Sequence, residues 1–495
     1  MEVNNHNHRA ILKRIAHQAM LDRGLQPEFS AEVITELEGL QAPAFADATP
    51  GNKFAGIVDA RRYVWSSIDN DDSRDLDQLT TAEVMPSKQV KILVAIADVD
   101  ASIKEGSAID LHAANNTTSV YTAAEIFPML PEKVSNNITS LNFDEDRLAI
   151  VIEMLVGEDG KLVGSNIYQA WVHNNARLTY NSVADWLDGN GSMPEEIRRV
   201  QGLAENLQLQ DRVAKQLKDL RYIHGALSLE TIESVPVFEG DQIRSLKMEK
   251  KNLAKEIIED FMIAANGVTA RFLSARQSPS IRRIVRTPKR WDRIVKIAAD
   301  HQFKLPEIPN PVALQEFLIL EKKNDPLHFP DLSLAVIKLL GAGEYMAEPP
   351  DAIGTGHFGL AVKDYAHSTA PNRRYPDLLT QRLLKAAIKG EPVPYRMDEL
   401  NYLAAHCTAA EDAANKVERQ VEKSAAALLL ESRIGERYDA IITGASGKGV
   451  WVRLIKEPVE GKLLKDFIGF DVGDLLRVQL ISVNVEKGFI DFQAV

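Results

Sequence analysis

The chain has 495 residues, a formal net charge of -12, and a composition with 45% hydrophobic and 26% charged residues. This length exceeds one ordinary core and predicts several domains, and the composition is typical of a soluble globular protein. A single cysteine excludes a disulfide framework and a cysteine-rich zinc site. The acidic charge argues against a protein that coats nucleic acid without specificity, although it allows an enzyme with a basic internal channel.

The N-terminus and the hydropathy of the chain predict a cytoplasmic protein. The first residues, MEVNNHNHR, are polar and lack the apolar core of a signal peptide. No window reaches the apolar length of a membrane span, so we expect no membrane partner. The lone Cys407 suits a reducing compartment.

Residues 1–60 form the first predicted domain, which is helical. Apolar periodicity predicts an amphipathic helix over residues 8–24, and Ser30 is the expected N-cap of a second helix that extends to Leu37. Residues 41–53 are rich in proline and small residues, as is typical of a linker. The helix pair fits either a helix-turn-helix or winged-helix module or a simple packing unit.

Residues 61–434 form a large predicted α+β domain. Continuous apolar runs at residues 91–99 and 147–156 are typical of buried strands. Helical patterns follow the strands, the last of them with several expected breaks. These patterns cover residues 194–220, 253–276, 376–389 and 398–434.

The sequence pattern changes from helical to strand-like in residues 435–495. Short alternating strands with glycine-bearing turns indicate a small β-barrel, about the size of one OB-fold. The predicted fold class is therefore multidomain α+β, with N-terminal helices, a central α+β domain and a C-terminal β-barrel.

The stretch from Ile68 to Leu79, IDNDDSRDLDQL, concentrates five aspartates directly before an apolar strand. Carboxylates held this close raise each other's pKa unless solvent or a cation neutralises them. Mg²⁺ binds such oxygens together with water and phosphate, which would give a metal site for phosphoryl chemistry. An acidic surface loop explains the same residues, and the stretch alone leaves both interpretations open.

A second polar stretch, Tyr365 to Leu384, contains two adjacent arginines before a predicted helix. Arg373 and Arg374 stand between two prolines, which fix the conformation of their loop. Guanidinium groups on a rigid loop suit the binding of phosphate and the stabilisation of charge on a reacting phosphate. Adjacent arginines before a helix are also common as plain salt-bridge partners.

Together these stretches resemble the ribonuclease II family, whose catalytic RNB domain digests RNA from the 3′ end. The resemblance extends from about Val64 to Lys423, and its motifs follow one another in family order. They read IDNDDSRDLDQL, IADVDASIKEGSAID, TSVYTAAEIFPMLP, SNNITSLNFDEDRLAIVIEM, ARLTYNSVADWL, HGALSLET, IIEDFMIAAN and GHFGLAVKDYAHSTAPNRRYPDLL. The N-terminal part of the chain resembles that of a shorter bacterial subgroup with a helix-turn-helix-like domain. The C-terminal barrel resembles the RNA-binding OB-fold of the family.

The resemblance implies a metal site for Mg²⁺, with Mn²⁺ as a substitute. The family's metal-coordinating aspartates fall on Asp69, Asp75 and Asp77. Of these, Asp77 is expected to be essential for cleavage and dispensable for RNA binding. The family's fourth aspartate falls on Gln78, which offers a neutral carbonyl oxygen and no charge. A neighbouring acid such as Asp72 could stand in for it.

The resemblance also implies a set of RNA contacts. Tyr121 is expected to stack on the 3′-terminal base, Glu418 to hold the terminal nucleotide, and Tyr180 to contribute to the preference for RNA. Arg373 is expected against the scissile phosphate, with Arg374 as a further RNA contact. Taken without the family, each tyrosine is ordinary packing and Glu418 an exposed helix charge.

Some residues depart from the family pattern or have no assigned role. Asn372 stands where the family often has an apolar residue, and Gln381 where it often has histidine, which affects fine geometry more than chemistry. His112, His357 and His367 lack a zinc spacing and are expected to be structural or to support residues of the site. His357 and His367 flank the approach to the arginine loop and are also candidates for contacts there.

The barrel also offers candidate RNA contacts near its turns. Lys448, Trp451 and Arg453 are expected to guide the incoming strand. Trp451 fits barrel core as well as it fits an RNA contact.

The function implied is a monomeric 3′-to-5′ exoribonuclease that hydrolyses single-stranded RNA to nucleoside 5′-monophosphates with the help of Mg²⁺. The alternative is a catalytically impaired RNA-binding protein on the same fold, with Gln78 as the lesion. A third hypothesis, a DNA-binding regulator acting through the N-terminal helices, is disfavoured by their weak basic character.

Overall fold

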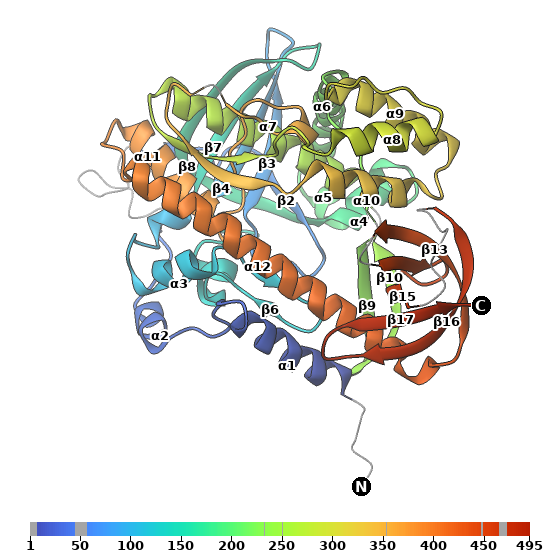
Figure 1. The fold of residues 1–495 in the computed structure, drawn as a ribbon. Helices are drawn as coiled ribbons and strands as arrows, with labels where there is room; N and C mark the ends of the chain where they lie inside the picture. Colours follow the sequence, from blue (N-terminus) through green and yellow to red (C-terminus); the bar gives the residue numbers. More distant parts are fainter. Residues whose placement is uncertain are drawn as a thin grey trace.

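The computed structural model describes residues 7–44, 57–231, 233–249, 251–352, 354–446, 449–464 and 473–495. A central sheet with helices around it forms the body of the molecule (Figure 1). The long helix α12 (Met397–Leu430) runs diagonally across this body to a separate C-terminal barrel. No helix among the described residues is long and apolar enough to cross a membrane.

The central sheet has six strands in the order β1-β8-β2-β3-β4-β7, and β8 pairs with β7 as well, so the sheet closes on itself. The strands are β1 (Val58–Asp59), β2 (Trp65–Asp69), β3 (Gln78–Val84), β4 (Val90–Ala97), β7 (Asp146–Val156) and β8 (Leu162–Thr179). The predicted strands at 91–99 and 147–156 are confirmed as β4 and β7. Seven of the eight residues of β4 are buried, which explains why its sequence is an unbroken apolar run.

Helices surround the closed sheet, and two helical predictions need correction. The helices are α3 (Ala108–Asn116), α4 (Tyr180–Leu187), α5 (Glu195–Arg199), α6 (Leu203–Ile223), α7 (Leu253–Ala275), α11 (Tyr375–Lys389) and α12. The single helix predicted over residues 194–220 is wrong, because Gly202 adopts a left-handed conformation with φ 80° between α5 and α6. The breaks expected in residues 398–434 are also wrong, because α12 contains no glycine or proline and continues to Leu430.

A second, smaller helical cluster lies beside the sheet and was not predicted. It comprises α8 (Trp291–Asp300), α9 (Pro311–Asn324) and α10 (Phe329–Leu340). Its own apolar core includes Trp291, Phe317 and Phe329. Three short two-stranded sheets complete this part of the chain: β5 (Val120–Tyr121) with β6 (Ile126–Phe127), β9 (Glu233–Glu239) with β10 (Gln242–Glu249), and β11 (Ser280–Ile284) with β12 (Glu344–Glu348).

The two predicted N-terminal helices are confirmed as α1 (His8–Leu21) and α2 (Ala31–Glu38). Ser30 caps α2 as expected, because its hydroxyl oxygen accepts the Val33 N–H at 3.4 Å. Helix α1 does not stand apart from the body but lies along α12 (Figure 1). Most of the linker predicted at 41–53 lies outside the described residues.

The predicted C-terminal barrel is confirmed. Its five strands close in the order β13-β14-β15-β17-β16. They are β13 (Arg437–Ser446), β14 (Gly449–Leu454), β15 (Glu460–Leu463), β16 (Leu475–Asn484) and β17 (Phe489–Ala494). Arg453, an expected RNA contact, instead pairs with Asp331 of α10 through two hydrogen bonds of 3.1 and 2.7 Å. Trp451 is half-buried, and Lys448 lies outside the described residues.

Candidate active site

The acidic stretch forms the loop between β2 and β3. Asp69 is the last residue of β2, and Asp77 directly precedes β3. The loop is held from outside by Arg177 of β8, whose guanidinium donates to the Ser73 carbonyl at 2.7 Å and to the Asp71 carbonyl at 3.4 Å. The side chains of Asp71 and Asp72 are exposed, so the buried acids of the site are found elsewhere in the loop.

Asp77 is the most buried of these carboxylates, with only 1% of the residue exposed. Its Oδ1 accepts the backbone N–H of Asn372 at 3.1 Å. Its Oδ2 lies 3.4 Å from Nε of Arg373 and accepts no hydrogen bond from the part of the chain that the structure describes. Burial raises the pKa of Asp77 to about 8, against the opposing charge of Arg373.

The two adjacent arginines have different environments. Arg374 donates to both carboxylate oxygens of Asp377, from Nε at 2.9 Å and from Nη2 at 2.7 Å. The same Asp377 accepts the N–H groups of Thr369 and Ala370, so the Asp377–Arg374 pair fixes the arginine loop on α11. The guanidinium of Arg374, predicted as an RNA contact, is thus engaged within the protein.

Arg373 points instead toward the acidic loop. Its side chain is 48% exposed, so a ligand can reach it. Burial opposes its charge, but Asp77 and Tyr121 outweigh this effect and raise the pKa of Arg373. The guanidinium therefore stays charged beside the buried carboxylate.

The backbone of the arginine loop brings the predicted base-stacking residue to the same place. The Arg373 carbonyl accepts the N–H of Ser119 at 3.0 Å and the hydroxyl of Thr118 at 3.2 Å. These residues lead directly into the hairpin β5–β6, which carries Tyr121. The hydroxyl of Tyr121 donates to Asp75 Oδ2 at 3.4 Å. The ring of this residue thus lies beside the acidic loop.

Glu418 of α12 completes this arrangement. Its Oε1 accepts the backbone N–H of Tyr121 at 2.7 Å. Burial raises the pKa values of both Glu418 and Tyr121. Tyr121 remains 41% exposed, so part of its ring is available to a ligand.

Tyr180 lies at the other side of the acidic loop, as the first residue of α4. Burial and the negative charge of Asp69 raise its pKa. Burial also raises the pKa of Asp69, and neighbouring Asp75 raises it further. The Nζ of Lys255 lies 5.8 Å from the centre of the Tyr180 ring. This places an aromatic ring and a lysine next to the first aspartate.

The three departures from the family pattern occupy different positions. Gln78 is the first residue of β3, pairs with Ile96 and is 7% exposed. Within the described ranges its side chain forms no hydrogen bond with the aspartates of the loop. Gln381 links α11 to the sheet, because its amide donates to the Ala97 carbonyl at 2.8 Å and accepts the Asp100 N–H at 3.0 Å. Asn372 supplies the N–H that binds Asp77.

The site fits a hard cation held by few protein ligands. Among the described residues, no three of His, Cys, Asp and Glu lie close enough to hold a metal ion together. Mg²⁺ does not require such a cage, because it usually keeps several waters and one or two carboxylates. The buried Oδ2 of Asp77 without a hydrogen bond and the raised pKa values of Asp69 and Asp77 both mark a place where positive charge would be stabilising.

Two of the predicted structural histidines pack in an aromatic group near the arginine loop. His367 Nδ1 lies 2.9 Å from the hydroxyl of Tyr345, and the ring of His357 lies 5.7 Å from that of Tyr365. Burial lowers the pKa values of both histidines, so they are neutral at physiological pH. Within the part of the chain that the structure describes, neither histidine forms a hydrogen bond or ion pair with an acid of the site.

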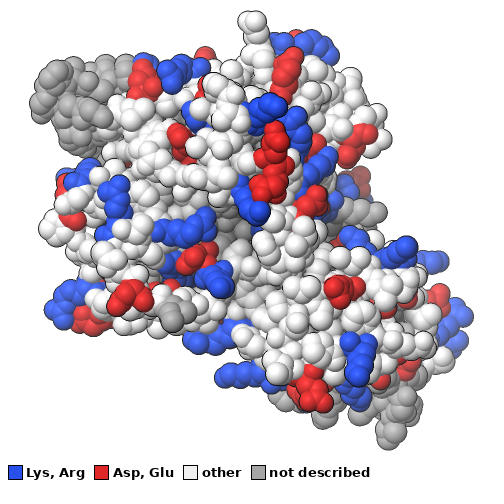
Figure 2. Space-filling view, turned by 90° about the horizontal axis from the view of Figure 1, so that it is seen from above, with Lys and Arg blue, Asp and Glu red and all other residues white. Residues whose placement is uncertain are grey.

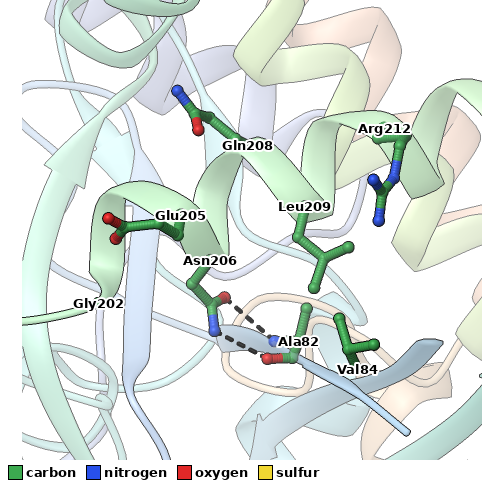
Figure 3. A pocket seen from close by; sticks show the side chains of 8 residues that line it. All are labelled: Ala82, Val84, Gly202, Glu205, Asn206, Gln208, Leu209 and Arg212. Carbon is green, nitrogen blue, oxygen red and sulfur yellow. Dashed lines mark hydrogen bonds between the residues drawn. The ribbon is translucent and has the colours of Figure 1, made fainter. Parts of the chain in front are cut away.

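One face of the molecule has mixed charge, and one surface hollow includes none of the predicted site residues. The face seen in Figure 2 carries Lys and Arg side chains interspersed with Asp and Glu, with no broad area of one sign. A hollow of about 440 Å³ lies between the end of β3 and α6 (Figure 3). Asn206 closes its floor with hydrogen bonds to the backbone of Ala82 at 3.1 and 2.8 Å. None of the predicted site residues lines this hollow.

The chain matches two known protein-family models. Residues 57–390 match the model of the RNB domain, and residues 436–495 match that of the RNase II-type exonuclease C-terminal S1 domain. The chain belongs to the RNB family. The resemblance drawn from the sequence motifs is therefore confirmed.

Relatives of this RNB protein include Ribonuclease R of Vibrio parahaemolyticus. The two are 30% identical over 490 residues, which cover 91% of this chain and 57% of the relative. The chain thus spans less than two thirds of that relative's length.

Among solved structures, Mycoplasma genitalium RNase R in complex with ribose-methylated single-stranded RNA superposes with a TM-score of 0.86 at 21% identity. That match covers 99% of this chain and 78% of the other. Yeast Ssd1, a pseudonuclease, has a TM-score of 0.66 at 15% identity, with 89% of this chain and 52% of the other covered. Both likenesses concern the fold.

Several contributors to the site were not predicted. Each of them involves a backbone group. They are the Asn372 N–H that binds Asp77, the hydrogen bond from the Ser119 N–H to the Arg373 carbonyl, and the hydrogen bonds from Arg177 to carbonyls of the acidic loop. Sequence motifs report side-chain types, and a backbone group carries no such signal. Arg177 stands in the motif ARLTY, which drew attention to Tyr180 alone.

Proposed function

We propose that this RNB protein is a 3′-to-5′ exoribonuclease that hydrolyses single-stranded RNA to nucleoside 5′-monophosphates. The observation that supports it best is the meeting of four distant segments at one place. Asp77, Arg373, Tyr121 and Glu418 come from the acidic loop, the arginine loop, the hairpin β5–β6 and α12. Arg373 Nε lies 3.4 Å from Asp77 Oδ2, and the Tyr121 hydroxyl donates to Asp75 of the same acidic loop at 3.4 Å. The Tyr121 N–H donates to Glu418 Oε1 at 2.7 Å.

Tyr121 and Glu418 are suited to holding the last nucleotide. The exposed part of the tyrosine ring offers a stacking surface, which is worth ~1–3 kcal/mol per base and accepts any base. The bond from the Tyr121 N–H to Glu418 fixes the backbone that carries this ring against α12. We call Tyr121 and Glu418 the terminal-nucleotide clamp. A clamp of this kind would present one phosphodiester at a time to the acidic loop.

Arg373 and Asp77 are suited to the phosphate that reacts. The half-exposed guanidinium can donate to a phosphate oxygen and stabilise charge that develops during in-line attack. Its Nε lies beside Asp77, and this contact limits the orientations that the guanidinium group can adopt. Asp77 is in turn fixed by the Asn372 N–H. The chain thus supplies positioning and one fixed positive charge.

We further propose Mg²⁺ as the cofactor, with Mn²⁺ as a substitute, held by water and by one or two of the predicted ligands Asp69, Asp75 and Asp77, with Gln78 beside them. When bound, such an ion lowers the pKa of a water and neutralises phosphate charge. The carboxylates then retain their negative charge at neutral pH, because the cation offsets the burial that raises the pKa of Asp77.

A second candidate function is RNA binding without cleavage. Gln78 replaces a charged ligand of the family, and one protein of similar fold, yeast Ssd1, is a pseudonuclease. Under this alternative the clamp and Arg373 would bind RNA while the acidic loop held a cation too weakly for hydrolysis.

Incubation of the protein with 5′-labelled poly(A) and Mg²⁺ separates these functions. An exoribonuclease shortens the labelled RNA step by step, which gives a ladder that ends in a short product, and it releases nucleoside 5′-monophosphates. A circular RNA of the same composition should stay intact, because it has no 3′ end. Tight binding without shortening, in Mg²⁺ or Mn²⁺, would overturn the proposal in favour of the second function.

The remaining proposals concern the state of the protein in the cell. We propose a monomer in the cytoplasm that acts on single-stranded RNA. We also propose domain boundaries at 1–60, 61–434 and 435–495. Sedimentation of the full chain at several concentrations tests the monomer, and limited proteolysis near residues 60 and 435 tests the boundaries.

A further inference from the structure

The N-terminal helix α1 has an apolar face that belongs to the same core as Val120 and Val417, the neighbours of the two clamp residues in sequence. Its buried residues recur at helical spacing, and the largest of them, Leu12, Ile15 and Met20, are at most 2% exposed. One continuous apolar cluster unites them with Val120 and Phe127 of the hairpin β5–β6. The remaining members of the cluster include Ala410, Ala414, Val417, Val421 and Ala425 of α12.

This cluster lies directly behind both clamp residues. Val120 precedes Tyr121, and Val417 precedes Glu418. Buried side chains thus flank each functional side chain on its own element. Figure 1 shows α1 alongside α12, with β6 next to them. A packed interior transmits small shifts, because side chains in it interdigitate with few voids.

Polar contacts support the same connection at both ends of α1. Near its start, Lys13 Nζ lies 3.6 Å from Glu125 of the hairpin. Just after its end, Arg23 Nη2 donates to Gln420 of α12 at 2.8 Å, two residues beyond Glu418. A polar contact therefore joins the helix to the hairpin, and another joins the residue just after the helix to α12.

The segment after α1 also fixes the chain that leads into the hairpin. The Gln26 N–H donates to Asn116 Oδ1, and Asn116 Nδ2 donates to the Gln26 carbonyl, both at 2.8 Å. Asn116 ends α3, and the next residue, Thr117, takes a left-handed conformation with φ 58°. The Thr117 carbonyl accepts the Tyr375 N–H at 2.8 Å. This contact joins the N-terminal segment to the loop that carries Arg373.

We propose that α1, through Leu12 and Ile15, positions the terminal-nucleotide clamp by fixing the hairpin β5–β6 against α12. The inference rests on the proposed function, and it assigns the N-terminal helices a role in holding the 3′ nucleotide. One hydrogen bond of 2.7 Å joins Tyr121 to Glu418. That bond fixes the backbone of Tyr121, and the shared core fixes the rest of the hairpin against α12.

The test measures stacking without hydrolysis. A short RNA with 2-aminopurine at its 3′ end is titrated with the full chain in EDTA, and the quenching of its fluorescence reports the stack. Ile15→Ala should retain RNA binding but quench less, and should bind about tenfold more weakly, which is within the range of one lost base stack. The conservative Ile15→Val should restore quenching, because it keeps most of the buried volume.

A matched control separates positioning from general destabilisation. Val33→Ala truncates a side chain of the neighbouring helix α2 that is 2% exposed. This side chain belongs to the core of the central sheet and not to the apolar cluster that joins α1, the hairpin and α12. Arg23→Met provides a second variant that removes a polar link without a cavity. Both alanine variants are checked by thermal unfolding. The expected result is reduced quenching with Ile15→Ala and Arg23→Met and unchanged quenching with Val33→Ala.

The possible results distinguish this inference from the proposed function. Equal loss of quenching in Ile15→Ala and Val33→Ala, or unchanged quenching in Ile15→Ala and Arg23→Met, would overturn the positioning role. Absence of quenching by the wild-type chain would overturn it too, since there would be no stack to position. Failure of the wild-type chain to shorten poly(A), with quenching intact, would contradict the nuclease and leave the positioning role supported.

Discussion

Two buried groups of charges lie at the ends of neighbouring strands, and only one of them is fully paired. Around Arg382, which is 4% exposed, Asp100 and Asp110 accept from the guanidinium at 3.1 and 2.7 Å. Lys385 pairs with Asp98 at 2.9 Å and with Asp100 at 2.7 Å. Burial opposes the charge of Asp100, but Lys385 and Arg382 outweigh it and lower its pKa.

The group around Asp77 has the opposite balance. One of its carboxylate oxygens accepts no hydrogen bond from the described residues, and burial raises the pKa of Asp77 to about 8. Its arginine partner is half-exposed, whereas Arg382 is enclosed. Fully paired charges stabilise a fold, while a buried carboxylate with a missing partner costs free energy until a ligand supplies one. The difference supports a structural role for the group around Arg382 and the proposed role of the group around Asp77 in binding a substrate or a cation.

The largest effect is expected from Asp77→Asn. The amide can still accept the Asn372 N–H, but it has lost its charge toward Arg373 and a cation, so hydrolysis of poly(A) should fall by on the order of a thousandfold. Stability should not fall, because the change removes a buried carboxylate whose ionisation is unfavourable. Single-turnover cleavage and thermal unfolding measure the two effects. The control Asp412→Asn, exposed on α12, should alter neither.

The next effect is expected from Arg382→Met, which should act on stability. It leaves Asp100 and Asp110 buried without their arginine, and breaking such a pair costs about 3–5 kcal/mol. Urea unfolding measures the loss. Arg396→Met removes an exposed pair with Asp398, in which the arginine side chain is 82% exposed, and should cost less than about 1 kcal/mol. Equal losses in the two variants would contradict the comparison.

A third prediction concerns a buried group that carries no charge. Burial lowers the pKa of His112 to about 4 from 6.5, and its ring lies 4.5 Å from that of Phe29. The unfolded chain therefore takes up this proton first as the pH falls below 6.5. Stability should decrease from pH 6.5 to about pH 4, by on the order of 3 kcal/mol.

Urea unfolding at a series of pH values measures this slope, with His112→Leu as the comparison. The leucine variant should show a shallower loss over the same range, because it has no proton to gain. Identical slopes for the two proteins would mean that other groups cause the acid sensitivity.

The smallest effect is expected from Gln78→Asp, which adds the family's fourth metal-ligand aspartate to Asp69, Asp75 and Asp77. Affinity for Mg²⁺, measured by calorimetry, should rise by about tenfold, since added ligand charge strengthens the binding of hard cations. Without metal the variant should be less stable, because one more like charge lies beside Asp77. Unchanged affinity would show that residue 78 does not take part in cation binding.

The sequence predicted much of the architecture because local patterns determined it. The apolar runs of β4 and β7, the Ser30 cap and the alternating strands of the barrel each express burial or capping within a few residues. The ordered motifs identified the family, which the domain matches confirmed. The helical cluster α8–α10 was missed because no family motif falls in residues 291–340, although its helices pack on one another through Trp291, Phe317 and Phe329.

The sequence by itself determined which residues could carry the chemistry: the aspartates of the acidic stretch, two arginines, two tyrosines and Glu418. Only the tertiary structure decided how they divide the work. Arg373 and Arg374 are adjacent and chemically identical, yet Asp377 engages one of them and leaves the other beside Asp77. The physical reason is that the Arg374–Asp377 pair is local in sequence, whereas the contact of Arg373 with Asp77 joins segments hundreds of residues apart. No local pattern encodes that contact, or the burial and pKa shift that accompany it.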